Sequence, residues 1–335
     1  MYLLMPVFFL LGYLLIALEH PIKIDKSASA LLTGVACWTL LVIGMGHGLE
    51  IPGYTPGEEH FAEHALLEHL SSIASILFFL MGAMTIVELI DAHEGFSVIT
   101  EKVKTTNKVT LLWALSFLTF FLSAALDNLT TAIVMAALLR KLIKDKEDLW
   151  FFAGMVVIAA NAGGAWSPIG DVTTIMLWIG GQVTALNIVK EVFLPSVVCL
   201  LIPLAAASFM LKGHLSRPEA SGGPDDEDLV GPFEQNLILV LGIGSLLFVP
   251  VFKTLTHLPP FMGILLGLGV LWVVTELLNT NRMNQSKRSV VAVLRRIDVP
   301  SVLFFLGILL AVAALETAGY LEELAAVLDK TFGSI

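Results

Sequence analysis

The chain has 335 residues, of which 56% are hydrophobic and only 14% are charged. Soluble globular domains average about 45–50% apolar and about 25% charged residues, and they need that charge to cover their surface. The net charge of −10 lies in short polar stretches without a basic patch, which excludes a nucleic-acid partner. Cys37 and Cys199 both lie in apolar runs, which excludes a disulfide framework. These features predict an all-α, polytopic protein of the lipid bilayer.

Seven apolar stretches are long enough to cross the hydrocarbon core, which takes about 20 residues of helix. The first has no basic segment before it and no Ala-x-Ala site, so it is predicted to be a span rather than a signal peptide. Two further stretches, 109–139 and 150–179, are longer and are interrupted by polar and glycine residues. The seven simple spans are predicted at 3–19, 29–46, 71–90, 188–211, 234–252, 261–278 and 299–320.

The charges around 109–139 indicate that this stretch folds back on itself. Basic clusters at 102–108 and 140–146 flank it, and short loops rich in Lys and Arg lie on the cytoplasmic side. A straight helix of about 31 residues would be about 46 Å long, well beyond the core of about 30 Å. We therefore predict a re-entrant hairpin over 109–139 that enters from the cytoplasm. The alternative, one long tilted helix, breaks the alternation of the loops downstream.

An acidic linker at 213–233, predicted to be cytoplasmic, separates two similar halves. Leu-Phe-Phe-Leu begins a span at 77–80 in the first half and at 303–306 in the second. With an external N-terminus, the matching spans run in opposite directions, which is typical of inverted-topology repeats in secondary transporters. The sequence thus predicts a first membrane repeat at 1–212, with the hairpin at 109–139 and a broken helix at 150–179. It predicts the start of a second repeat at 234–335, which is expected to be incomplete because its own hairpin would begin where the chain ends.

Polar residues gather at the two predicted breaks. Ionisable groups at membrane depth cost roughly 2.5–3.5 kcal/mol each on insertion scales, and they usually serve a function. Gly163, Gly164, Pro168 and Gly170 are expected to interrupt the helix and expose backbone carbonyls. The candidate ion- and proton-binding residues are Asp127, Asn128, Thr130 and Thr131 at the hairpin tip and Asn161, Ser167, Asp171, Thr173 and Thr174 at the break.

These side chains have the chemistry of a site for a small hard cation. Carboxylate, amide, hydroxyl and carbonyl groups are all oxygen donors. A carboxylate can also take up a proton, so a site that holds either a cation or protons exchanges one for the other. The alternative is that Asp127 and Asp171 are structural caps of half-helices, and capping does not exclude ion binding.

The two motifs resemble those of the NhaD-type sodium/proton antiporters, in the superfamily of arsenite pumps and dicarboxylate transporters. The resemblance rests on Asp127-Asn128-Leu-Thr-Thr and on Gly163-Gly164-Ala-Trp-Ser-Pro-Ile-Gly-Asp171. It implies exchange of Na⁺, and possibly Li⁺, for H⁺ by alternating access, with Asp127, Asn128, Asp171 and Thr173 at the site. It also implies a homodimer, no enzymatic activity and no resident cofactor or metal beyond the transported ion. The expected location is the bacterial inner (plasma) membrane.

Other functions stay open at this point. A Na⁺-coupled carboxylate symporter or an anion exporter is the rival within transporters, although two aspartates at the breaks disfavour an anion. An intramembrane aspartyl protease is the rival of another class, but Pro168 stands where such proteases place a glycine. In the predicted external loop 47–70, His60-Phe-Ala-Glu63-His64 fits the H-x-x-E-H metal motif. That match is short, and an amphipathic interfacial helix is favoured there.

Overall fold

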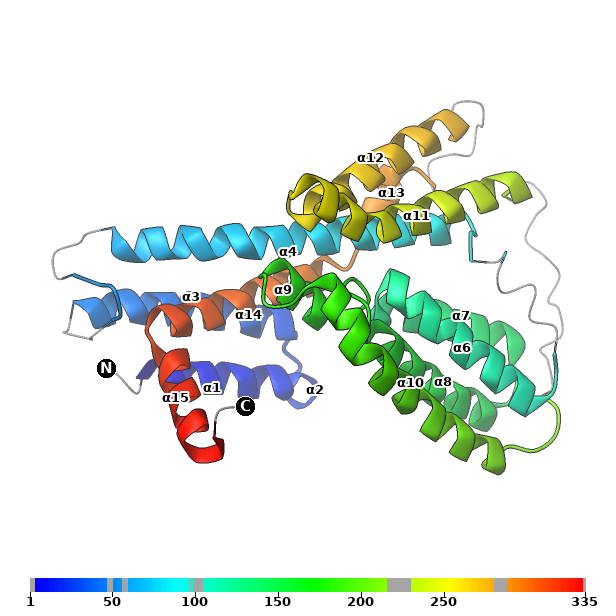
Figure 1. Ribbon diagram of the computed structural model, residues 1–335, viewed down its shortest axis with the longest axis horizontal. Helices are drawn as coiled ribbons and strands as arrows, with labels where there is room; N and C mark the ends of the chain where they lie inside the picture. Colours follow the sequence, from blue (N-terminus) through cyan, green and yellow to red (C-terminus); the bar gives the residue numbers. More distant parts are fainter. Residues whose placement is uncertain are drawn as a thin grey trace. The chain divides into compact units, whose positions relative to one another are not determined.

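A computed structural model describes residues 4–46, 51–55, 60–96, 98, 105–215, 230–279 and 288–333. These residues form helices and no strand, which confirms the all-α prediction (Figure 1). Among them, eight helices are long and apolar enough to cross a membrane: α3 (Lys26–Met45), α4 (Phe61–Ala92), α6 (Lys108–Leu126), α8 (Lys146–Ala165), α10 (Ala185–Met210), α11 (Pro232–Thr256), α12 (Pro260–Asn279) and α14 (Val299–Thr317). The shorter helices are α1 (Leu4–Ala17), α2 (Glu19–Ile22), α7 (Asn128–Leu142), α9 (Val172–Ile179), α13 (Val290–Leu294) and α15 (Tyr320–Phe332). The protein is therefore a multi-pass integral membrane protein.

Polar residues between the apolar runs begin several of these helices. Asp25 accepts a hydrogen bond from the Ser27 amide before α3, and Asn107 accepts one from the Thr110 amide before α6. Asp145 does the same for the Glu147 and Asp148 amides before α8. An N-cap of this kind satisfies amides that lack a partner within the helix, so each helix starts at the residue that provides the acceptor.

The chain divides into two compact units, residues 1–77 with 298–335 and residues 78–297. In the first unit, α3 packs against α14 through two glycines. A Cβ atom on Gly34 would lie 2.7 Å from the Gly307 carbonyl oxygen, and one on Gly307 would lie 2.4 Å from the Ala30 carbonyl carbon. Only glycine allows the two backbones to come this close. The Trp38 indole donates a hydrogen bond of 2.9 Å to the Leu310 carbonyl across the same contact.

In the second unit, α11 and α12 pack with the part of α4 that follows Leu77. A Cβ on Gly82 would lie 2.2 Å from an Ile264 methyl group, and one on Gly242 would lie 2.5 Å from the Ile90 side chain. Helices α1, α3 and α14 of the first unit likewise pack through glycines. The two Leu-Phe-Phe-Leu helices, α4 and α14, also end alike, because Glu94 and Gly319 both adopt positive φ, of 53° and 85°.

The second unit also contains a bundle of α6, α7, α8 and α10. The chain reverses between α6 and α7, as predicted for the hairpin, and the pair spans 108–142 rather than 109–139. Lys108 at the start of α6 lies 2.7 Å from Asp148, just after α7 ends, so both ends of the hairpin lie at one end of the bundle. The Leu215 amide donates to the Thr106 carbonyl at the same end. The described residues of three basic segments that were predicted to be cytoplasmic therefore lie at one end of this bundle.

Some features differ from the predictions or lie beyond them. Helix α4 begins at Phe61, so the last part of the predicted loop 47–70 is helical; His60 pairs with Glu63 at 3.1 Å. No group of three or more His, Cys, Asp or Glu side chains suited to a metal occurs among the described residues.

The sequence did not predict α13 and α15. Most of the linker, 216–229, lies outside the described residues, and the repeat boundaries stay a prediction.

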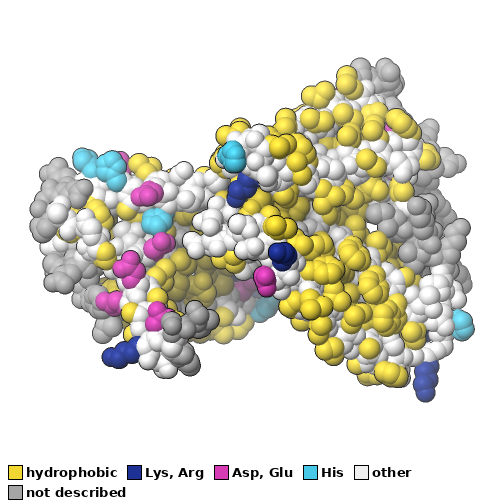
Figure 2. Space-filling model, in the orientation of Figure 1, with side chains coloured by type: hydrophobic (Ala, Val, Ile, Leu, Met, Phe, Trp, Pro, Cys, Tyr) yellow, Lys and Arg dark blue, Asp and Glu magenta, His cyan; other side chains and the backbone are white. Residues whose placement is uncertain are grey.

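The surface of the second unit fits a lipid environment. Leu186, Leu194, Ile202 and Phe209 are all exposed along α10. Hydrophobic side chains cover this face in the space-filling view, with few charges among them (Figure 2). Exposed apolar area of this extent marks a surface that contacts lipid or another protein.

Candidate functional site

The first helix break lies between α6 and α7. Helix α6 ends at Leu126, and α7 begins at Asn128. Asp127 between them has φ 91° and ψ 156°, a conformation that is almost confined to glycine. Its carbonyl accepts a hydrogen bond from the Thr131 amide and so starts the next helix. An aspartate is thus held in a strained conformation at the hairpin tip, and such strain often occurs at functional sites.

The second break lies between α8 and α9, at residues 166–171. Asp171 is the N-cap of α9, and its Oδ1 atom accepts a hydrogen bond of 2.8 Å from the Thr173 amide. The predicted interruption of the helix is present, but it begins after Gly163 and Gly164, because α8 continues to Ala165. These glycines serve packing instead: a Cβ on Gly163 would lie 2.1 Å from the Phe120 carbonyl oxygen, and one on Gly164 would lie 2.2 Å from the Gly170 carbonyl oxygen.

Two serines join the two breaks, which the glycines allow to lie close together. The Ser123 hydroxyl donates a hydrogen bond of 2.5 Å to the Ala160 carbonyl on α8. The Ser167 hydroxyl donates one of 2.5 Å to the Ala124 carbonyl on α6. Both bonds are buried, where an unsatisfied carbonyl would be costly. They fix the end of α6 against the segment that carries Asp171.

A polar cluster forms where the two breaks meet. The Asn128 side-chain amide donates one hydrogen bond of 2.6 Å to Asp171 Oδ2 and one of 3.0 Å to Asn161 Oδ1. Asn161 in turn donates from its Nδ2 atom to the Val157 carbonyl of its own helix. Asn161 is exposed, whereas Asn128 and Asp171 are half-buried. The structure therefore brings three of the predicted site residues, from α7, α8 and the cap of α9, into direct contact.

The other predicted residues lie around this cluster. The Thr174 hydroxyl donates to the Ser167 and Asp171 carbonyls, at 2.8 and 2.9 Å, so Thr174 and Ser167 both hold the break together. Thr131 is buried, and its hydroxyl has no hydrogen-bond partner within the part of the chain that the structure describes. The side chain of Thr130 lies outside the described part. Whether these residues ligate an ion stays a prediction.

Sequence reasoning passed over three residues that shape the site. Ser123 lies four residues before Asp127, but only the fold shows that it binds α8. Gly163 was taken for a helix breaker, although glycine in an apolar helix also allows close packing. Lys253 contacts α9 from α11 and belongs to neither of the two motifs. Its isolation in an apolar helix was the available signal.

Comparisons with known proteins agree with the motifs. A family model described as citrate transporter matches residues 13–335. The chain is 46% identical to sodium/proton antiporter 1 of Arabidopsis thaliana, over 99% of this chain and 55% of that protein. It is 30% identical to the Na(+)/H(+) antiporter NhaD of Vibrio cholerae, over 96% of this chain and 69% of that protein. The chain belongs to the NhaD-type antiporter branch of the citrate transporter family.

This NhaD-type chain spans about half the length of the first relative and 76% of a second, sodium/proton antiporter 2 of Arabidopsis thaliana, to which it is 42% identical. All of these relatives are named as transporters. The comparisons give no support to the intramembrane protease. The family resemblance that was drawn from Asp127-Asn128 and from the Gly163–Asp171 segment is therefore confirmed.

Proposed function

We propose that this protein exchanges Na⁺, or Li⁺, for H⁺ across a membrane by alternating access. The observation that carries the proposal is the contact of Asn128 with both Asp171 and Asn161 at the junction of two helix breaks. A carboxylate and two amides supply oxygen ligands for a small cation. Half-helix ends in secondary transporters provide sites of this kind.

The geometry suggests how the two ions compete. The Asn128 side-chain N–H groups lie between the Asp171 and Asn161 oxygens, in the place that a bound cation would take. When Na⁺ enters, Asn128 rotates its amide and presents its own oxygen to the ion. When Asp171 or the neighbouring Asp127 takes up a proton, the negative charge that attracts Na⁺ is lost. Binding of one ion therefore releases the other.

The architecture proposed for this movement is a pair of inverted repeats. The two similar trios, α1–α3–α14 and α11–α12 with the second part of α4, support it through their glycine contacts. The matched left-handed ends of α4 and α14 support it as well. In this proposal the hairpin and broken helix of the first repeat carry the ion.

The remaining properties are extensions of the same proposal. We expect a homodimer in the lipid bilayer, no resident cofactor and no enzymatic activity. The bacterial inner membrane stays our proposed location, and the Arabidopsis thaliana relatives make a plant membrane the alternative. Antibody or fluorescent-tag localisation in the source organism decides between them.

A Na⁺-coupled carboxylate symporter is the second candidate, because the matching family model is described as citrate transporter. An anionic substrate would meet the Asp171 carboxylate in the same cluster, and like charges repel. Uptake of labelled citrate that depends on Na⁺ would favour this candidate. Its absence, together with Na⁺-dependent proton movement, favours exchange.

The experiment that tests exchange is dissipation of a pH gradient by added Na⁺ in inside-out vesicles that contain the full-length protein. We expect Na⁺ to collapse the gradient, and Asp127→Asn and Asp171→Asn to reduce this response to that of empty vesicles. Glu191→Gln, which changes an exposed acid on α10, is the matched control and should keep the activity. Full activity of Asp171→Asn would refute the site, and an inactive unmodified protein would refute the function.

A further inference from the structure

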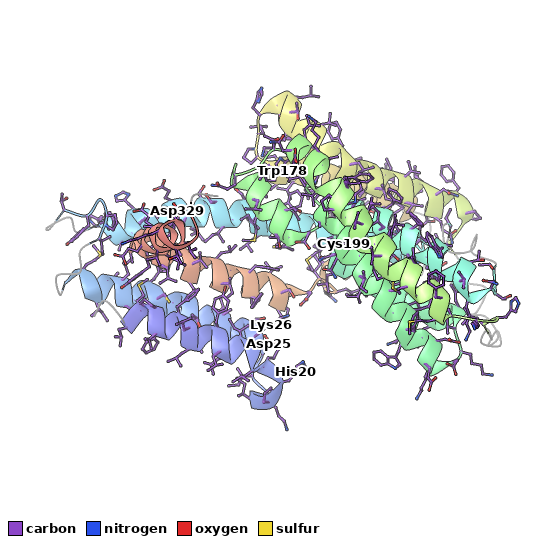
Figure 3. The ribbon with its side chains drawn as sticks, turned by 60° about the horizontal axis from the view of Figure 1, so that its bottom comes forward. His20, Asp25, Lys26, Trp178, Cys199 and Asp329 are labelled. Atoms are coloured by element: carbon purple, nitrogen blue, oxygen red, sulfur yellow. The ribbon has the colours of Figure 1, made fainter. Side chains whose placement is uncertain are left out.

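Lys253 makes an unusual contact with the helix that follows the second break. It lies in the last turn of α11, and its Nζ atom donates a hydrogen bond of 3.0 Å to the Trp178 carbonyl of α9. The same ammonium group lies 4.5 Å from the centroid of the Trp178 ring. Trp178 itself is only 3% exposed, so its ring is held in place by the surrounding helices (Figure 3).

The chemistry of α9 makes a cation favourable at this position. The carbonyls at the end of a helix lack intrahelical partners and carry the negative end of the helix dipole. Trp178 is next to last in α9, and its carbonyl accepts a hydrogen bond of 3.2 Å from the Gly181 amide in addition to the one from Lys253. The face of an indole ring also attracts an ammonium ion. One lysine therefore meets both the helix end and an aromatic face.

Helix α11 packs loosely against the broken segment, so the Lys253 contact matters more for holding α9. A cavity of about 650 Å³ separates the last turns of α11 from the broken segment. Ile243, Leu247 and Pro250 of α11 line one part of it, and Pro168 and Ile169 of the break line another. Since this cavity is open and leaves the two apolar surfaces apart, the Lys253–Trp178 contact is a specific attachment between α9 and α11.

Helix α9 connects this attachment to the ion site. It has eight residues, about 12 Å of helix. Asp171 caps its first turn, and Lys253 binds at its last turn. A helix this short moves as a rigid body, so a shift at Trp178 changes the position of the Asp171 carboxylate relative to Asn128.

We propose that Lys253 is a positioning residue, a latch that holds the end of α9 on α11 and thereby orients Asp171 for Na⁺. This inference rests on the proposed exchange function. It predicts that loss of the ammonium group weakens apparent Na⁺ affinity and leaves the maximal rate nearly unchanged, because the ion-binding oxygens themselves remain.

The first test is the Na⁺ dependence of gradient dissipation in vesicles with the full-length protein. For Lys253→Met we expect the apparent KM for Na⁺ to rise severalfold and the maximal rate to change less than twofold. Lys253→Arg keeps the charge and should lie between Lys253→Met and the unmodified protein. Lys190→Met, which removes an exposed lysine of α10, is the control and should leave KM unchanged. An unchanged KM in Lys253→Met would overturn the latch.

Chemical rescue separates the charge from a general packing effect. In a background where Cys37 and Cys199 are replaced by alanine, Lys253→Cys should show the raised KM. Treatment with 2-aminoethyl methanethiosulfonate adds an ammonium group at this position and should restore the KM. Methyl methanethiosulfonate adds a neutral group through the same kind of disulfide bond and should not restore the KM. Equal recovery with both reagents would contradict the proposal.

A labelling measurement that needs no transport distinguishes failure of the latch from failure of the exchange function. Leu177 on α9 is 44% exposed, so Leu177→Cys can report how firmly α9 is held. Its reaction with a maleimide should become severalfold faster when Lys253→Met is added in the same cysteine-free background. An unchanged rate overturns the latch, whatever the vesicles show. If the unmodified protein does not exchange Na⁺ but labelling accelerates, the exchange function fails and the latch remains.

Discussion

Two helix contacts in this protein are built in the same way but have different roles. Helices α3 and α14 approach through Gly34 and Gly307, and α6 and α8 approach at Gly163, which touches the Phe120 backbone. Each contact also has a side chain bound to the facing backbone: Ser27 donates to the Pro300 carbonyl in the first, and Ser123 to the Ala160 carbonyl in the second. In a membrane, packing of small residues and such interhelical bonds hold helices together.

The contacts differ in where the helices end. The glycines of α3 and α14 lie within continuous helices, so the contact is a plain structural interface. Gly163 lies two residues before the end of α8, and Phe120 lies six residues before the end of α6. Close packing at this point therefore brings two helix ends together, along with Asp127, Asn128 and Asp171. The comparison shows that glycine packing becomes a site only where it aligns the ends of helices.

The largest effect is expected from Gly163→Ala. The added Cβ would lie 2.1 Å from a backbone oxygen, which cannot rotate away, so we expect a loss of at least about 3 kcal/mol of stability and little folded protein. The control is Gly154→Ala in the same helix, where a Cβ meets no atom within 4 Å. That change should stabilise α8 by about 0.5–1 kcal/mol. Thermal unfolding in detergent measures both, and equal behaviour would remove the role given to Gly163.

Asp127→Gly separates stability from function at the hairpin tip. Glycine adopts the observed φ of 91° without strain, so the variant should gain about 1–3 kcal/mol in stability. It should also lose Na⁺-dependent exchange, because the carboxylate is gone. Unfolding in detergent and dissipation of the pH gradient measure the two effects. A variant that is less stable than the original would show that the Asp127 side chain supports the fold.

The two serines allow a direct comparison of the contacts. Ser123→Ala and Ser27→Ala each remove one hydrogen bond to a facing carbonyl, and each should lower stability by about 1 kcal/mol. Only Ser123→Ala should also raise the apparent KM for Na⁺, because its bond aligns the broken helices. An equal change in KM for both variants would mean that exchange responds to stability alone.

The smallest effect concerns a histidine outside both contacts. His93 is fully buried just after α4, and burial lowers its pKa more than the Glu234 carboxylate at 3.8 Å raises it. Its neutral form is therefore favoured in the folded state. Stability should be constant above about pH 6.5 and fall below it, by at most about 1.4 kcal/mol per pH unit. His93→Gln should remove this slope in thermal unfolding, and an unchanged slope would assign it to other groups.

Much of the fold follows from local sequence properties. Apolar runs of about 20 residues give the spans because the bilayer core has a fixed thickness. The reversal at Asp127 followed from two basic clusters and from a length that exceeds that core. The family followed from short polar motifs, because polar residues at membrane depth are rare enough to be specific. The start of α4 at Phe61 and the presence of α15 were missed, since these segments lack the uniform apolar pattern of the spans.

The sequence by itself determined that Asp127, Asn128 and Asp171 lie at interruptions of apolar helices. Asn161 lies inside α8, four residues before the helix ends. The sequence could not show which of these residues touch, because residues on three helices meet only through packing. The tertiary structure decided that Asn128 binds Asp171 and Asn161, that Gly163 packs rather than breaks the helix, and that Lys253 holds the far end of α9. Composition and length act locally along the chain, whereas these contacts depend on how closely two backbones approach.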